Sequence, residues 1–212
     1  DDPVPRADIE QAIRAGQMAS TSSSVQAYAA IHVTDRAKLE KLVELTGGQT
    51  KVARCGAFFV ICGDSRRHRL LAERRQSTYN ARLEGFLVAS IDAALFAQNV
   101  CIAFEAMGYG ICYIGGLRND LPAVDELLNL PGGVYPLFGL CVGTPAVLFE
   151  EAYPDDATAL QRIDDYDAAY QAYLTQRGAE PKTWSEAMDR LHANARRDIL
   201  ASYYQGKGAR FD

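Results

Sequence analysis

The sequence lacks the short motifs that identify most metal-dependent and nucleotide-binding enzymes. Its only histidines are His32, His68 and His192, far apart in the chain, and no His-Glu-x-x-His pair occurs, so we expect no metal site. There is no Gly-x-Gly-x-x-Gly fingerprint, no Walker loop and no Gly-x-Ser-x-Gly elbow. These absences argue against the common dinucleotide-binding, NTPase and hydrolase classes.

A long uncharged segment and a basic balance are also missing. The most apolar stretch, 83–107, contains Glu84, Asp92 and Glu105, and its longest uncharged run is 93–104. That run is shorter than the roughly 20 residues that span a bilayer. We therefore expect a buried core helix, no signal peptide and no membrane partner. The 22 basic and 27 acidic residues give a net charge of −5, which argues against a nucleic-acid partner.

Cysteine usage points to a reducing compartment. The chain has five cysteines, an odd number, and none forms a Cys-x-x-Cys pair. Cys62, Cys101, Cys112 and Cys141 fall in apolar runs, and Cys55 is the fifth. We expect buried structural thiols in a cytoplasmic protein, in preference to a redox or metal role.

Apolar periodicity predicts a single domain in which helices and strands are mixed. Helices are expected at 5–19, from Thr34-Asp35 to Leu45, at 83–107 and at 123–128, and strands at 29–33, 57–62, 111–114 and 135–142. Gly47-Gly48 should end the second helix, because glycine adopts the left-handed conformation there. Four short strands with unevenly spaced helices indicate an α+β or mixed three-layer domain.

The tail, residues 147–212, differs in composition from the rest of the chain. It predicts two polar amphipathic helices, near 160–176 and 184–204, with too few apolar residues for an independent core. We expect an arm that packs on its own domain or on a partner subunit.

Four segments carry polar groups suited to a ligand, although each alone is typical of ordinary structure. The arginine-rich stretch 66–75 is either a phosphate grip or, as we favour, a solvated segment balanced by acidic neighbours. The other three are the hydroxyl run Thr21–Ser24, Gln49 after a double glycine, and the pair Gly115-Gly116 after a predicted strand.

Together and in order, the last three segments resemble one family, the FMN-dependent, oxygen-insensitive NADPH nitroreductases and flavin reductases of bacteria. The resemblance covers most of the chain and is carried by Thr21–Ser24, Leu45–Gln49, Ala97–Asn99, Tyr113–Arg118, Pro136–Pro145 and Thr183–Ser185. It implies an α+β, nitroreductase-like three-layer sandwich, with a central, mostly antiparallel sheet flanked by helices and an extended C-terminal helical arm. It also implies a homodimer with FMN at the subunit interface.

The resemblance divides the chain into an FMN-binding core, 1–146, and a helical arm, 147–212, used for dimer packing and on the NADPH and substrate side. It implies that the cofactor is bound by Thr21, Ser22, Ser23, Gln49, Tyr113, Ile114, Gly115 and Gly116. It places NADPH or substrate against Arg177, Lys182 and Arg196.

The implied reaction needs no catalytic acid or base from the protein, because FMN carries the electrons and the protein orients it. NADPH would deliver hydride to FMN and leave, and a nitroaromatic, quinone or free flavin would then use the same pocket in ping-pong order. The alternative is a non-catalytic dimeric binding or regulatory module on the same scaffold that has lost FMN.

Two cationic segments of the family are absent here. Members carry His-Arg-Ser-x-Arg just before the Asp-x-Pro that opens this chain, and Lys-Pro-Arg after the last strand. We therefore expect residues before Asp1 and between Ala146 and Val147 to be missing from the sequence given. Pro181-Lys182 replaces the arginine pair that the resemblance predicts before Trp184, which leaves the choice between NADPH and NADH open.

Overall fold

The computed structural model describes residues 2–79, 83–144, 156–176, 180–183, 185–186 and 200–208. The chain forms two compact units, Asp1–Ala146 with Ile199–Asp212 as the first and Val147–Asp198 as the second. The first unit contains the sheet and all the residues predicted to bind FMN, which are Thr21–Ser23, Gln49 and Tyr113–Gly116.

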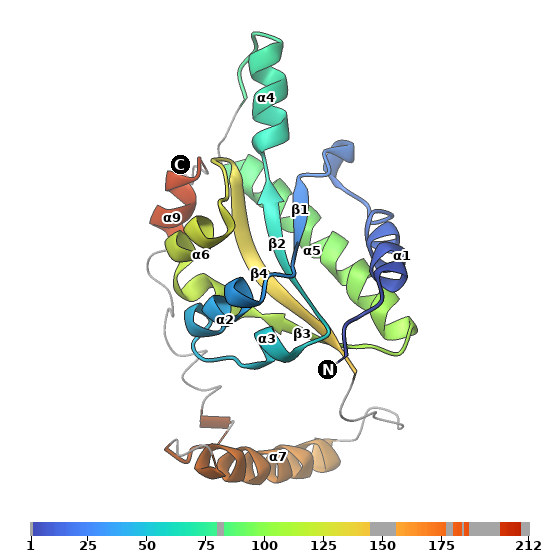
Figure 1. The fold of residues 1–212 in the computed structure, drawn as a ribbon, viewed down its shortest axis with the longest axis vertical. Coiled ribbons are helices and arrows are strands. Elements are labelled where there is room, and N and C mark those ends of the chain that lie inside the picture. Colours follow the sequence, from blue (N-terminus) through green and yellow to red (C-terminus); the bar gives the residue numbers. More distant parts are fainter. Residues whose placement is uncertain are drawn as a thin grey trace. The chain divides into compact units, whose positions relative to one another are not determined.

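A four-stranded antiparallel sheet forms the centre of the first unit (Figure 1). Its strands are β1 (Tyr28–Val33), β2 (Ala57–Asp64), β3 (Gly110–Ile114) and β4 (Val134–Gly143). The order β1-β2-β4-β3 places β1 and β3 at opposite edges. All four strands lie where apolar patterning predicted them, which confirms that part of the sequence analysis.

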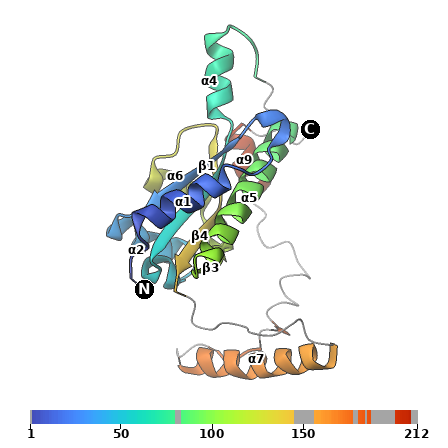
Figure 2. The same ribbon diagram turned by 90° about the vertical axis from the view of Figure 1, so that its right-hand side faces the viewer.

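The sheet is covered on both faces because side chains of β2 alternate between two apolar clusters. Phe59 and Ile61 join the cluster of α1 (Arg6–Gly16) and α5 (Leu83–Ala106). Phe58 and Val60 join the cluster of α2 (Arg36–Leu45), α3 (Lys51–Arg54) and α6 (Leu121–Leu128). Figure 2 shows α1 and α5 on one side of the sheet and α2 and α6 on the other. The core is therefore three-layered.

Local capping explains where the helices on the second face begin and end. The carboxylate of Asp35 accepts a hydrogen bond from the Lys38 N–H at 3.1 Å, and Asp120 caps α6 through the Ala123 N–H at 3.1 Å. Gly47 and Gly48 have φ of +80° and +81°, so they end α2 as predicted.

Helix α5 is long and apolar enough to cross a membrane by length and composition alone. Most of one side is nevertheless buried in the core, at Ala89, Asp92, Ala93, Phe96, Ala97, Val100, Cys101 and Phe104. The prediction of a core helix is confirmed. A second apolar surface on α5 remains exposed, at Leu87, Ile91, Leu95 and Ile102. Their spacing of four, four and seven residues places them on one stripe.

The arginine-rich stretch forms a helix of its own, α4 (Arg66–Arg74), with no buried side chain. It projects beyond the end of the sheet (Figures 1 and 2). The expectation of a solvated, charge-balanced segment fits this exposure, and Arg67 pairs with Asp64 at 3.3 Å.

The end of the chain belongs to the first unit through α9 (Leu200–Gly206). Tyr204 is buried and donates its hydroxyl hydrogen to the Pro136 carbonyl at 3.2 Å. Lys207 forms a largely buried ion pair with Asp125 at 2.5 Å. These contacts hold α9 and the residue that follows it, Lys207, against the core.

The second unit contains α7 (Asp156–Gln176), where the first tail helix was predicted. Thr183 and Glu186 form a reciprocal capping box, with backbone N–H to side-chain distances of 2.9 and 3.0 Å. Most of the other predicted tail helix, and the 146–147 junction, lie outside the described residues.

Candidate functional site

The predicted hydroxyl loop is a short 3-10 turn, η1 (Ser22–Ser24), just before β1. Ser23, Ser24 and Gln26 have φ of +48°, +58° and +51°, a region that non-glycine residues seldom occupy. Such backbone persists only where the surroundings over-determine it. Ser22 and Ser23 are exposed, so their hydroxyls face solvent or a ligand.

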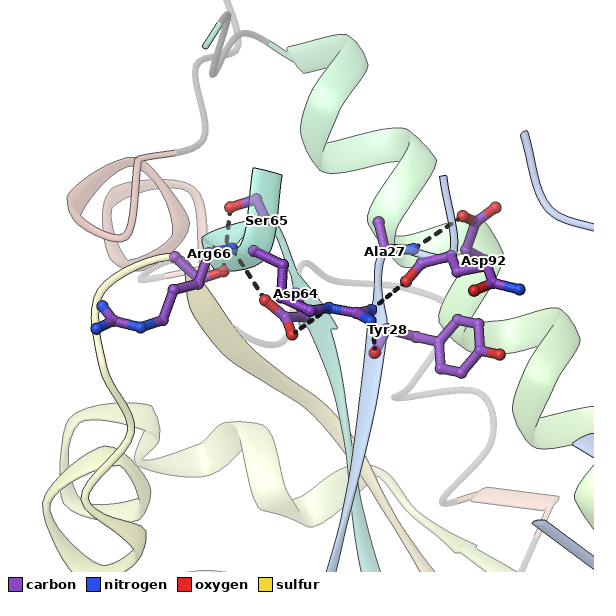
Figure 3. A network of polar contacts seen from close by, with 9 residues as sticks. Ala27, Tyr28, Asp64, Ser65, Arg66 and Asp92 are labelled. Atoms are coloured by element: carbon purple, nitrogen blue, oxygen red, sulfur yellow. Dashed lines mark hydrogen bonds and ion pairs between the residues drawn. The ribbon is translucent and has the colours of Figure 1, made fainter. Parts of the chain in front are cut away.

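One anchor of this loop is Asp92, a fully buried carboxylate on α5. Its Oδ1 accepts from the Ser22 N–H and its Oδ2 from the Ala27 N–H, both at 3.1 Å. Figure 3 shows this carboxylate facing the backbone of Ala27 at the start of β1. Because both oxygens are used, Asp92 fixes the backbone at both ends of the segment from Ser22 to Ala27, which contains the hydroxyl loop.

The other anchor comes from α4. Arg67 donates to the carbonyls of Gln26 at 2.5 Å and Tyr28 at 3.2 Å. Its guanidinium forms an ion pair with Asp64. Asp64 also accepts a hydrogen bond from the Arg66 N–H at 2.9 Å (Figure 3). Beside the loop lies an open hollow of about 390 Å³, lined by Gln17, Gln26, Tyr28, Ala29 and Arg67.

Neither anchor was predicted from the sequence. The one signal for Asp92 was an acidic residue within the most apolar stretch of the chain, which we interpreted only as evidence against membrane insertion. Arg67 had no signal that distinguished it from its arginine neighbours.

The second group of predicted residues forms a compact turn at the other edge of the sheet. Gln49 donates from Nε2 to the Thr46 carbonyl at 2.9 Å, and no bond to its Oε1 is found among the described residues. Gly116, in η2 (Gly115–Asn119), packs so closely here that an added Cβ would lie 2.6 Å from the Thr46 oxygen. The structure thus brings Gln49 and Gly116 into contact, as the sequence analysis grouped them.

Gly115 has more room than Gly116. An added Cβ would first meet the Arg118 guanidinium, at 3.3 Å. That guanidinium donates to the Leu137 carbonyl at 2.6 Å, which keeps a positive charge beside the glycine turn. Arg118 is a further site residue for which the sequence analysis gave no role.

Tyr113 and Ile114 face opposite sides of β3. Tyr113 is 44% exposed, and its ring lies against Phe138 with centroids 5.2 Å apart. Its hydroxyl donates to Gln98 Oε1 at 3.4 Å and accepts from Cys101 Sγ at 3.3 Å. Burial raises the pKa of Tyr113, so it remains a protonated donor at neutral pH. The Ile114 side chain is fully buried, which leaves only its backbone for a ligand.

A single chain does not bring the two groups together. The hydroxyl loop precedes β1 and the glycine turn follows β3, at opposite sheet edges, so about 14 Å of strand spacing separates them. On α5, Ser22 contacts Asp92 whereas Tyr113 contacts Cys101, about 13 Å further along the helix axis. The exposed apolar stripe of α5 belongs to the same helix.

The residues predicted to bind NADPH or substrate are only partly described. Arg177 and Arg196 lie outside the described residues, and Lys182 is half-buried in the second unit, one residue before the Thr183 capping box.

Comparison with known proteins supports the assignment suggested by these motifs. The family model described as "Nitroreductase family" matches residues 1–144, and that of its C-terminal domain matches residues 143–212. The chain belongs to the nitroreductase family. The resemblance seen in the sequence is therefore confirmed.

Two curated nitroreductase relatives match nearly the whole chain. "FMN reductase (NADPH)" of Bacillus subtilis is 41% identical over 95% of this chain and 88% of the relative. "Oxygen-insensitive NADPH nitroreductase" of Salmonella typhimurium is 39% identical over 98% of this chain and 91% of the relative.

Solved structures of nitroreductases match the fold. NfrA1 nitroreductase from B. subtilis aligns with a TM-score of 0.78 at 38% identity, covering 99% of this chain and 92% of that one. NADPH:FMN oxidoreductase from Vibrio harveyi, complexed with NAD+, aligns with a TM-score of 0.74 at 32% identity over 98% and 90%. The α+β fold with a four-stranded antiparallel sheet is thus that of nitroreductases.

Proposed function

We propose that this nitroreductase is an FMN-dependent NADPH oxidoreductase that reduces small molecules such as nitroaromatics, quinones or free flavin. The observation that carries the proposal is the pair of rigidly held polar turns, one presenting serine hydroxyls and the other the Gln49 amide and Gly115-Gly116. Its relatives named FMN reductase (NADPH) and oxygen-insensitive NADPH nitroreductase support the reaction class.

The polar groups present fit FMN. The exposed hydroxyls of Ser22 and Ser23 and the half-buried Thr21 suit a phosphate or ribityl chain, because Asp92 and Arg67 hold the loop in place before any ligand binds. On the second turn, the residues that would hold the flavin ring are Gln49, Tyr113, Ile114 through its backbone, Gly115 and Gly116. FMN, when bound, supplies the two-electron chemistry.

Each residue of the second turn has a distinct task. Gln49 can offer a ring N–H its amide oxygen, which accepts no hydrogen bond among the described residues, while its own N–H donates to the Thr46 carbonyl. Tyr113 presents an exposed aromatic surface beside the glycine turn. The Arg118 guanidinium adds positive charge next to Gly115, which favours an electron-rich ligand.

We propose a homodimer, with FMN shared between the subunits. The hydroxyl loop and the glycine turn lie at opposite edges of one protomer, so a second copy is needed to bring one of each together. The exposed stripe Leu87, Ile91, Leu95 and Ile102 offers an apolar surface for that contact. Contact with a second copy of the chain also explains why α5 is apolar nearly all round.

We assign FMN binding to the core 1–146 and an extended helical arm to 147–212, whose last turn, α9, packs on the core. In this proposal Arg177, Lys182 and Arg196 bind NADPH or substrate, and the arm contributes to dimer packing. The described chain holds all of its cysteines as free thiols, which fits a cytoplasmic location.

The test uses the purified full-length protein incubated with FMN and freed of excess by gel filtration. We expect retained yellow colour and NADPH oxidation that depends on a quinone or a nitrofuran, with NADH run in parallel. Retained flavin without turnover would contradict the oxidoreductase. Neither flavin nor turnover would support the alternative, a dimeric binding or regulatory module that has lost FMN.

A further inference from the structure

The segment Ala97–Asn99 on α5 is one of the motifs that carry the resemblance to nitroreductases, and the proposed function gives it no task. Its middle residue, Gln98, is exposed, three residues after Leu95 and four before Ile102. Gln98 therefore lies on the exposed apolar stripe of the helix. A polar side chain there would lose its water on subunit contact, so it needs a hydrogen-bond partner of its own.

That partner is the hydroxyl group of Tyr113. It donates to Gln98 Oε1 at 3.4 Å and accepts from the Cys101 thiol at 3.3 Å. Gln98 and Cys101 are three residues apart, so they are neighbours on one face of α5. Burial raises the pKa of Tyr113, so its hydroxyl remains a donor toward Gln98 at neutral pH. The hydroxyl is thus held between two side chains of one helix.

The ring of Tyr113 leans toward the glycine turn. The backbone of Tyr113 lies opposite Leu140 in the antiparallel pair of β3 and β4, but the ring packs on Phe138, with centroids 5.2 Å apart. Because the strands are antiparallel, residue 138 lies on the side toward which β3 continues into Gly115. A diagonal contact of this kind is within reach of an aromatic side chain. The ring therefore extends toward the turn that the proposed function assigns to the flavin ring.

We propose that Gln98 is a positioning residue of the flavin site, which fixes the Tyr113 ring beside the glycine turn before flavin binds. The inference rests on the proposed function, in which Tyr113 contacts FMN. A phenol that is 44% exposed has other rotamers open to it when nothing holds its hydroxyl. An aromatic contact requires a defined ring orientation, and a side chain ordered in advance loses less entropy when the ligand binds. Gln98 acts through Tyr113 and has no contact of its own with the cofactor in this proposal.

Two variants remove the contact from its two sides. Tyr113→Phe deletes only the hydroxyl and leaves the ring on Phe138. Gln98→Met keeps an unbranched side chain with good helix propensity but offers no amide oxygen. The matched control is Gln11→Met, the same replacement at an exposed glutamine of α1.

A double-mutant cycle on FMN affinity separates positioning from a merely structural role. Fluorescence titration of the full-length protein, freed of flavin, measures the dissociation constant in the wild type, the two single variants and the double variant. We expect each single replacement to raise the constant for FMN about three- to tenfold. The double variant should bind no more weakly than Tyr113→Phe, because Gln98 has no hydroxyl left to act on. Gln11→Met should bind as the wild type does.

A measurement without flavin tests the contact itself. NMR of the protein with isotope-labelled tyrosine rings identifies the Tyr113 signals as those that are lost in Tyr113→Phe. We expect these signals to move in Gln98→Met and to stay in place in Gln11→Met.

The possible failures are distinguishable. Wild-type protein that binds no FMN would reject the proposed function, and with it this role of Gln98. Wild-type protein that binds FMN no better than Gln98→Met does would reject the inference alone. Equal weakening by Gln98→Met with and without the Tyr113 hydroxyl would also overturn it, since Gln98 would then act by another route. Tyr113 signals that stay unchanged in Gln98→Met would contradict the contact.

Discussion

The carboxylate of Asp92 accepts the backbone N–H of Ala27 at 3.1 Å in a site from which solvent is excluded. A charge is costly in such a place unless hydrogen bonds satisfy it. Its hydrogen bonds to the backbone offset that cost, and they hold in place a loop that contains three non-glycine residues at positive φ. In the proposed enzyme it is a positioning residue, because it acts through the hydroxyl loop.

Asp92→Asn should weaken both the fold and flavin binding. An amide has one acceptor oxygen, so its NH2 would face one of the two N–H donors. We expect the free energy of unfolding to fall by about 1–3 kcal/mol. Denaturant titration measures this, and fluorescence titration should show a dissociation constant for FMN raised at least about tenfold, or about 1.4 kcal/mol. Glu105→Gln, exposed on the same helix, is the control. Unchanged flavin affinity in Asp92→Asn would remove Asp92 from the site.

Alanine at the two adjacent glycines should have different effects. At Gly116 the new Cβ would meet the Thr46 carbonyl, so we expect about 1–3 kcal/mol of destabilisation and reduced flavin retention. At Gly115 it would meet only the end of the Arg118 side chain, so stability should change by less than about 0.5 kcal/mol. Thermal unfolding and flavin absorbance of the two variants give the comparison. Equal stability of both would contradict the packing described here.

A charge on the exposed stripe of α5 should separate the subunits. Ile91 is 55% exposed in a single protomer, so Ile91→Glu leaves the core untouched but would bury a carboxylate in the proposed interface. Light scattering should find a folded monomer that retains no flavin. Met18→Glu, at a more exposed methionine outside the stripe, should remain a dimer. A dimeric Ile91→Glu protein would place the interface elsewhere.

Subunit complementation tests whether the FMN site is shared. Ser22→Asp sets a negative charge in the hydroxyl loop, and Gln49→Leu removes the amide of the other turn; each homodimer should lose its flavin. A heterodimer isolated through two different tags keeps one intact site of two, so it should retain about half of the wild-type flavin. A heterodimer without flavin would mean that each site is built from one chain.

Local patterns predicted the four strands and the helices α1, α2, α5 and α6 of the core, but not the short helix α3. The strands are short because alternating or continuous apolar runs end at polar and glycine residues, as at Ala57–Asp64. Asp35 and the pair Gly47-Gly48 bounded α2, since capping and positive φ are properties of residue type. The helix α4 was less predictable, because arginines suit an exposed helix and a solvated loop equally well.

The sequence by itself also determined the family, because the order of the motifs along the chain can be read without knowing where they lie in space. Tertiary structure alone decided which of them meet. It joined Gln49 to Gly116 but placed the hydroxyl loop at the other sheet edge, because strand order depends on how the chain crosses the sheet. It also made Asp92 an anchor of the hydroxyl loop, since long-range burial leaves no local pattern.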